Sequence, residues 1–92
     1  MHTIRLFSDI DETTLEKLVD ALAEVEDGAD LTIQICSGGG YIYYALGIID
    51  YIHARKFHTT AEVLGMAASA AALITLACDR IHEIGFAEAD PL

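Results

Sequence analysis

The sequence predicts an α/β fold built around a small, mostly parallel sheet. Short β-rich segments alternate with segments of helical periodicity, and turn-forming residues separate them. The expected order is strand, helix, strand, helix, strand, helix, strand, in which right-handed crossovers place the helices against the faces of the sheet. Since 92 residues suffice for one small domain and contain no linker or repeat, we expect residues 1–92 to form a single domain.

The first strand is expected at residues 3–7, followed by a polar turn and a helix. Asp11 or Thr13 can cap the start of this helix, and Gly28 can close its end. Its predicted buried stripe consists of Leu15, Leu18, Val19, Leu22 and Val25.

The second strand is expected at residues 31–36 and ends in three glycines, which permit a sharp turn and a close approach of the backbone to a ligand. A helix from about residue 41 to residue 55 should follow. Its predicted buried stripe consists of Ile42, Ala45, Leu46, Ile49 and Ile52. The tyrosines of this helix either anchor an interface or fill the edge of the core; they are Tyr41, Tyr43, Tyr44 and Tyr51.

The third strand is expected at residues 59–64, with Gly65 ending it. A nearly all-apolar helix at residues 67–78 and a short strand around residues 80–84 complete the pattern. The two cysteines, Cys36 and Cys78, lack the spacing of a zinc site or a disulfide framework. We expect both to be reduced core residues.

The composition excludes some classes of partner. A net charge of −10 argues against binding to nucleic-acid phosphates or to anionic lipid headgroups. The sequence has no apolar stretch of the roughly 18 to 20 residues that a membrane span needs, so we expect no membrane association and a cytoplasmic location. The apolar fraction of 53% predicts that part of the surface forms an interface, as in a homo-oligomer.

Ser69 and the turn at residues 37–40 both lie where a predicted strand gives way to a predicted helix. In a parallel sheet, both would lie at the same carboxyl edge. A hydroxyl at a helix start is close to unpaired N–H groups, and amides of the glycine turn could complete an oxyanion hole. Structural roles remain open: Ser69 as a helix cap or small core residue, and the glycines as a tight turn.

The same residues favour no cofactor and no metal. The glycine turn lacks the Lys-Ser/Thr ending of a phosphate-binding loop, and it does not match the dinucleotide pattern G-x-G-x-x-G. The histidines form no recognisable metal-binding pair; they are His2, His53, His58 and His82.

From residue 4 to about residue 85, the chain resembles the ClpP family, the proteolytic subunits of the Clp protease, and related phage-type peptidases. Residues 33–40 look like the family segment I-x-I-N-S-P-G-G, and residues 45–50 look like its A-G-x-x-I-Y-D helix. Residues 65–70 look like the nucleophile motif G-Q-A-A-S-M. The stretch from Ser37 to Ser69 fits the family pattern without a gap.

This resemblance implies a ClpP-like and crotonase-like fold, a spiral of βαβ units. It makes Ser69 the nucleophile and the backbone N–H groups of Gly40 and Ala70 the oxyanion hole. The supporting glycine turn comprises Ser37, Gly38 and Gly39. The resemblance also implies a polypeptide substrate and an AAA+ unfoldase as a partner.

The chain departs from the family pattern in two ways. Within the motifs, Cys36 replaces Asn, Gly38 replaces Pro, Met66 replaces Gln and Ala70 replaces Met. The family's general-base histidine follows the nucleophile by about two dozen residues, with the aspartate much farther on. Here that place is occupied by residues 90–92, so neither triad partner is at its family position.

Three functions follow as expectations. The first is a truncated ClpP-like serine endopeptidase domain that carries the nucleophile and oxyanion segments and is inactive as an isolated chain, because His82 lies at the wrong position to act as the base. The alternative is a non-catalytic assembly or regulatory module that acts through protein–protein contacts. A third and weaker candidate is the binding of acyl groups or acyl-CoA, since crotonase-type folds use a related pair of amides.

Overall fold

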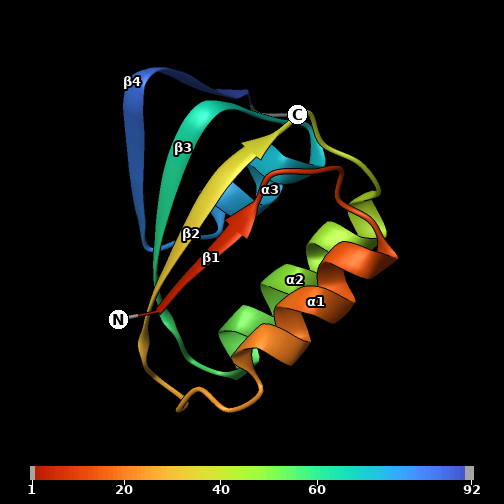
Figure 1. Cartoon of the computed structure of the whole chain (residues 1–92), viewed down its shortest axis with the longest axis vertical. Coiled ribbons are helices and arrows are strands. Elements are labelled where there is room, and N and C mark those ends of the chain that lie inside the picture. The colour runs from red at the N-terminus through yellow and green to blue at the C-terminus, as the bar shows by residue number, and fades with distance from the viewer. Residues whose placement is uncertain (1, 91–92) are drawn as a thin grey trace.

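The computed structural model describes the backbone of residues 2–90 and the side chains of residues 2–84. Within this part of the chain, strands and helices alternate as predicted. The elements are β1 (His2–Leu6), α1 (Glu12–Leu22), β2 (Asp30–Ser37), α2 (Ile42–Ala54), β3 (His58–Ala68), α3 (Ala70–Leu76) and β4 (Arg80–Asp90). The strands pair in parallel in the order β1-β2-β3-β4, which confirms the α/β class and the parallel sheet (Figure 1).

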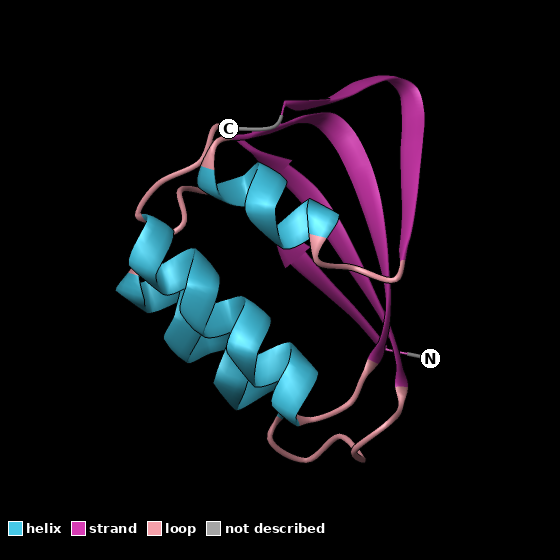
Figure 2. Ribbon diagram, turned by 180° about the vertical axis from the view of Figure 1, so that it is seen from behind, coloured by secondary structure: helices cyan, strands magenta, loops and turns pink. Residues whose placement is uncertain are grey.

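All three helices of the described residues lie on one face of the sheet (Figure 2). The alternation along β2 explains the core, because Leu31, Ile33 and Ile35 are buried while the residues between them are only partly covered. On the other face, a row of polar side chains crosses the strands. Gln34 receives a hydrogen bond from Arg5 Nε at 3.3 Å and donates one to Glu62 at 3.1 Å. The apolar core therefore lies between the sheet and the helices.

The start of α1 is capped by Asp11, one of the two predicted caps. Its side chain accepts a hydrogen bond from the Thr14 amide at 3.0 Å, and its own amide donates to the Thr14 hydroxyl at 3.1 Å. The predicted end at Gly28 is wrong, because the helix ends at Leu22. The guanidinium of Arg55 donates to the carbonyl groups of Leu22 and Val25, so the helix end needs no glycine cap.

The buried side of α2 differs from the predicted stripe. Its buried residues are Ala45, Ile48 and Ile52. The prediction is wrong for Ile42 and Leu46, which are 47% and 45% exposed. The helix also faces α1 at Gly47, where a Cβ would lie 3.2 Å from a methyl carbon of Leu15. Since α2 packs against α3 on one side and against α1 on another, the side that carries Ile42 and Leu46 stays uncovered.

The third crossover unit also differs from the prediction. β3 does not end at Gly65 but continues to Ala68, because a bulge between Leu64 and Met66 shifts its register against β4. The helix that follows is shorter than predicted, and β4 is longer, reaching Asp90. No helix in residues 2–90 combines the length and the apolar content that crossing a bilayer requires.

The prediction that both cysteines lie in the core is wrong for Cys36, whose thiol is free and exposed. Cys36 follows the buried Ile35 on β2, so the alternation of side chains along the strand turns it to the face opposite the helices. Cys78 is half-buried after α3, and burial raises the pKa of its thiol to about 11. Cys78 therefore remains protonated at neutral pH.

Asp79, in the turn between α3 and β4, holds the beginning of β3. Its carboxylate accepts hydrogen bonds from the amide of Thr59 at 2.8 Å and from the Thr59 hydroxyl at 3.3 Å. Its own amide donates to the same hydroxyl at 3.0 Å. The amide of Thr59, foremost among these contacts, lowers the pKa of the Asp79 carboxyl in the folded chain.

We therefore expect Asp79→Asn to lower the free energy of unfolding at pH 7. A carboxyl whose pKa is lowered by folding contributes stability above its unfolded pKa of about 4, and this contribution is lost as the pH falls through the folded value. The difference between the variant and the wild type should disappear in acid. Urea unfolding at a series of pH values measures it, with Asp50→Asn, an exposed carboxyl of α2, as the control. An equal loss of stability at pH 7 and in acid would contradict this assignment.

Candidate active site

Ser69 stands between the end of β3 and the start of α3. Its backbone has φ 55° and ψ −122°, a positive φ that is uncommon for a residue with a side chain. Its carbonyl accepts hydrogen bonds from the amides of Ala72 and Leu73, whereas its exposed hydroxyl has no hydrogen-bond partner among the described residues. The hydroxyl is thus neither a cap of α3 nor part of the core, although both roles are compatible with the sequence.

The glycine turn after β2 lies directly against Ser69. A Cβ on Gly39 would lie 2.8 Å from the Cβ of Ser69, 2.9 Å from the carbonyl oxygen of Ala68 and 3.3 Å from the amide nitrogen of Ala70. Gly39 also has a φ of +112°. The residue must therefore be glycine for both steric and conformational reasons. The two segments that the sequence placed at one edge of the sheet do meet there.

Gly40 is held from the opposite side by the connection between β1 and α1. The amide of Ile10 donates to the carbonyl of Gly39 at 2.9 Å, and the amide of Tyr41 donates to the carbonyl of Ile10 at 2.8 Å. A Cβ on Gly40 would lie only 2.2 Å from the carbonyl oxygen of Ile10. No sequence pattern indicates this contact, because Ile10 takes part through its backbone, which is the same for nearly every residue type.

Ser37 ties the same parts together through its side chain. Its hydroxyl donates to the carbonyl of Ser8 at 2.8 Å and accepts a hydrogen bond from the amide of Gly39 at 3.1 Å. The residue is 5% exposed. Gly38 has open space around its Cα, since a Cβ there would meet no atom within 4 Å.

Two backbone N–H groups in the segments that meet at Ser69 are not used by the hydrogen bonds of the described residues. The parallel bridge to Ile10 uses the carbonyl of Gly39 and the amide of Tyr41, so the amide of Gly40 takes no part in it. Within the described residues, neither this amide nor that of Ala70 has a hydrogen-bond acceptor. An exposed hydroxyl beside unpaired N–H groups suits chemistry in which negative charge develops on an oxygen.

The histidines lie away from this edge of the sheet. His2 and His58 begin β1 and β3, at the opposite edge. His53 lies in the last turn of α2, where its Nε2 is 3.3 Å from the carbonyl oxygen of Ala77. His82, near the start of the edge strand β4, pairs in register with Glu62 of β3. Residues 2–84 contain no group of three or more His, Cys, Asp or Glu side chains arranged to hold a metal ion.

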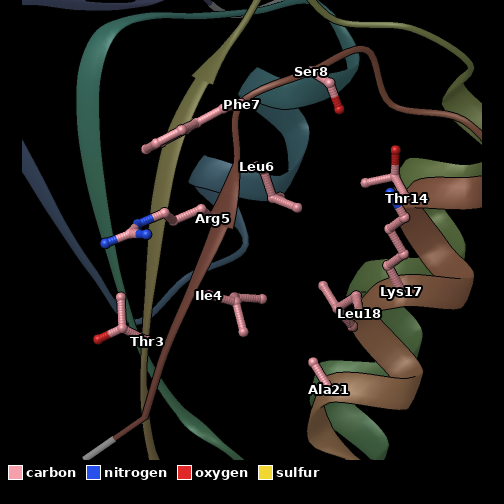
Figure 3. A pocket seen from close by; sticks show the side chains of 10 residues that line it. All are labelled: Thr3, Ile4, Arg5, Leu6, Phe7, Ser8, Thr14, Lys17, Leu18 and Ala21. Carbon is pink, nitrogen blue, oxygen red and sulfur yellow. The ribbon is translucent and has the colours of Figure 1, made fainter.

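A hollow of about 630 Å³ lies between β1 and α1, apart from Ser69 (Figure 3). Leu6 and Leu18 form part of its apolar lining, and Arg5 and Lys17 supply its charged groups. The hydroxyl of Thr14 in this hollow is already engaged by the carbonyl of Asp9 at 2.8 Å. The lining contains no carboxylate and no histidine, so we do not assign it to the reaction centre.

A sequence model of the Clp protease family matches residues 1–90. The chain belongs to the Clp protease family. Its fold is similar to that of ClpP1 from Listeria monocytogenes, with a TM-score of 0.76 and 28% identity over 83% of this chain and 46% of that one. The N165D mutant of the same Listeria protein matches with the same values. No curated protein sequence matches the chain significantly.

The fold is also similar to that of the ClpP protease catalytic domain from Plasmodium falciparum. The TM-score is 0.77 and the identity is 24%, over 87% of this chain and 52% of that one. The chain therefore spans about half the length of these Clp protease structures.

We expect Gly39→Ala to destabilise this Clp protease chain by about 2 to 4 kcal/mol, from the strain of a positive φ and from the overlap with Ser69. Gly38→Ala is the matched control, because it adds the same methyl group one residue earlier in open space, and its stability should stay within about 0.5 kcal/mol of the wild type. Urea unfolding of both variants measures the difference. Equal stability of the two would show that the turn does not press against Ser69.

Proposed function

We propose that this chain carries the nucleophile and oxyanion half of a ClpP-type serine endopeptidase site. Ser69 is the nucleophile, and the amides of Gly40 and Ala70 form the oxyanion hole. The observation that carries the proposal is the exposed hydroxyl of Ser69, which stands on a strained residue and has no structural partner in the described chain. Membership of the Clp protease family supports the same assignment.

The proposed reaction begins with attack of the Ser69 oxygen on a peptide carbonyl. The carbonyl oxygen gains negative charge in the tetrahedral intermediate, and each well-placed N–H donor is typically worth about 3 to 4 kcal/mol to the transition state. The serine proton must pass to a base. None of the four histidines is placed to accept it, because the described positions of all four lie away from the carboxyl edge.

The base and its acidic partner therefore come, in this proposal, from residues beyond these 92 or from a second chain. A serine peptidase site that lacks a triad member retains only about 10³- to 10⁴-fold acceleration over water. The 92 residues alone should then be nearly inactive on peptides. The polypeptide substrate, the AAA+ unfoldase partner and the cytoplasmic location belong to the proposal through the family alone.

A non-catalytic assembly module is the second candidate, and the outer side of α2 favours it. Around the start of this helix, Tyr41 is 66% exposed and Tyr43 is 86% exposed, and the exposed side chains of Ile42 and Leu46 lie beside them. The two rings of Tyr41 and Tyr44 pack edge to face, 6.1 Å apart. Exposed aromatic and aliphatic side chains of this kind are typical of protein interfaces, including those of homo-oligomers.

A fluorophosphonate probe tests the proposed nucleophile. We expect slow but selective labelling of Ser69, located by mass spectrometry, at a rate about 10³-fold or more below that of a complete serine peptidase. Ser8, which is also exposed, is the matched internal control and should stay unlabelled. Ser69→Ala should abolish the labelling. Equal labelling of Ser8 and Ser69 would remove the case for a prepared site.

Light scattering at micromolar concentration tests the assembly surface. If α2 forms an interface, Leu46→Asp should shift the protein towards the monomer, because a carboxylate would be buried without a partner. Phe7→Asp, at a position that is 51% exposed on the other side of the molecule, should leave the assembly unchanged. A wild-type protein that is a monodisperse monomer would contradict the assembly module.

A further inference from the structure

The glycine turn is fastened to the connection between β1 and α1 by three hydrogen bonds. One runs from the Ser37 hydroxyl to the carbonyl of Ser8, at 2.8 Å. The others join Ile10 to the carbonyl of Gly39 and the amide of Tyr41, at 2.9 Å and 2.8 Å. Figure 3 shows Ser8 at the end of β1, where the chain turns towards α1. A segment near the beginning of the chain thus determines the path of the turn.

This fastening leaves Gly40 little freedom. Its neighbours on both sides are bonded to the backbone of Ile10, which is fully buried, and its own Cα lies so close that a Cβ would be 2.2 Å from the Ile10 carbonyl oxygen. On the other side, Gly39 lies against Ser69. The amide of Gly40 can therefore change its position relative to Ser69 only if the connection at residues 8–10 moves or a hydrogen bond breaks.

Ser37 is the residue whose side chain joins the two sides of this arrangement. Its hydroxyl donates to Ser8 and at the same time accepts from the amide of Gly39. We propose that Ser37 is a positioning residue, whose hydroxyl holds the connection at residues 8–10 and the glycine turn together so that the Gly40 amide keeps its place beside Ser69. This inference rests on the proposed function, because that placement matters to a reaction only if the amide stabilises an oxyanion.

A purely structural hydroxyl would have a different effect. Removing it would leave the buried amide of Gly39 without an acceptor and lower the stability of the whole chain. If the hydroxyl positions the Gly40 amide, its removal must also slow the reaction at Ser69, and by more than the smaller fraction of folded protein explains. The chain offers a matched comparison in Thr59, a residue that is 3% exposed and whose hydroxyl bridges an amide and a carboxylate at the opposite edge of the sheet.

The experiment compares the full chain with Ser37→Ala, Ser37→Thr and Thr59→Val, at a temperature where all are folded. The readouts are the melting temperature, the rate of fluorophosphonate labelling at Ser69, and the amide resonances of Gly39 and Gly40 in a ¹H–¹⁵N spectrum. We expect Ser37→Ala to slow labelling about ten- to hundredfold. This loss of rate is at most as large as the one caused by removing an oxyanion donor completely, which is about 10²- to 10³-fold. It should also shift both resonances, and Ser37→Thr, which keeps the hydroxyl, should restore rate and resonances.

Thr59→Val should lower the melting temperature while leaving the labelling rate and the two resonances unchanged. The inference is overturned if Ser37→Ala labels at the wild-type rate with unchanged resonances, or if Thr59→Val slows labelling as much as Ser37→Ala does. If Ser37→Ala fails to fold, Ser37→Cys replaces it, because a thiol is a weaker hydrogen-bonding group than a hydroxyl. Its labelling rate should again be lower than the rates of the wild type and of Ser37→Thr. If even the wild type is not labelled at Ser69, the proposed function fails, and the resonances alone decide whether Ser37 positions Gly40.

Discussion

The structure around Ser69 depends on one constraint, which is the close contact of the glycine-turn backbone with Ser69 and with the backbone of Ile10. At Gly39 and Gly40 there is no room for a Cβ, because Ser69 lies on one side and the carbonyl of Ile10 on the other. Three segments far apart in the sequence, at residues 8–10, 37–41 and 68–70, can approach one another only because these two residues lack side chains. At this contact the chain leaves β2, the connection from β1 leads into α1, and Ser69 precedes α3.

The same contact determines which groups of the proposed site this chain brings together. A hydroxyl and unpaired amides lie together at the carboxyl edge, where ligands of open parallel sheets bind. No histidine is among the described side chains at this edge of the sheet. The chain covers about half the length of the two Clp protease structures from Listeria monocytogenes and Plasmodium falciparum. Apolar side chains are also exposed on α2.

Most of the architecture followed from local signals. The order of elements came from the alternation of β-rich and helical segments, and the cap at Asp11 came from a polar turn before an apolar stripe. The errors have tertiary causes. Gly28 did not close α1 because Arg55, from another part of the chain, satisfies the carbonyls at its end. Ile42 and Leu46 did not enter the core because the position of α1 determines which side of α2 is covered, and Gly65 did not end β3 because a bulge carries the strand past it.

The sequence by itself determined the fold class, the family, and the identity of Ser69 and the glycine turn as the residues to consider, because residue types, periodicity and an ungapped motif spacing are properties of the chain alone. Only the tertiary structure decided that the Ser69 hydroxyl is exposed and uncapped, that Gly39 presses against it, and that residues 8–10 hold the turn. These features arise from backbone contacts between distant segments. A backbone amide or carbonyl is the same in nearly every residue, so its partner becomes known only when the chain is folded.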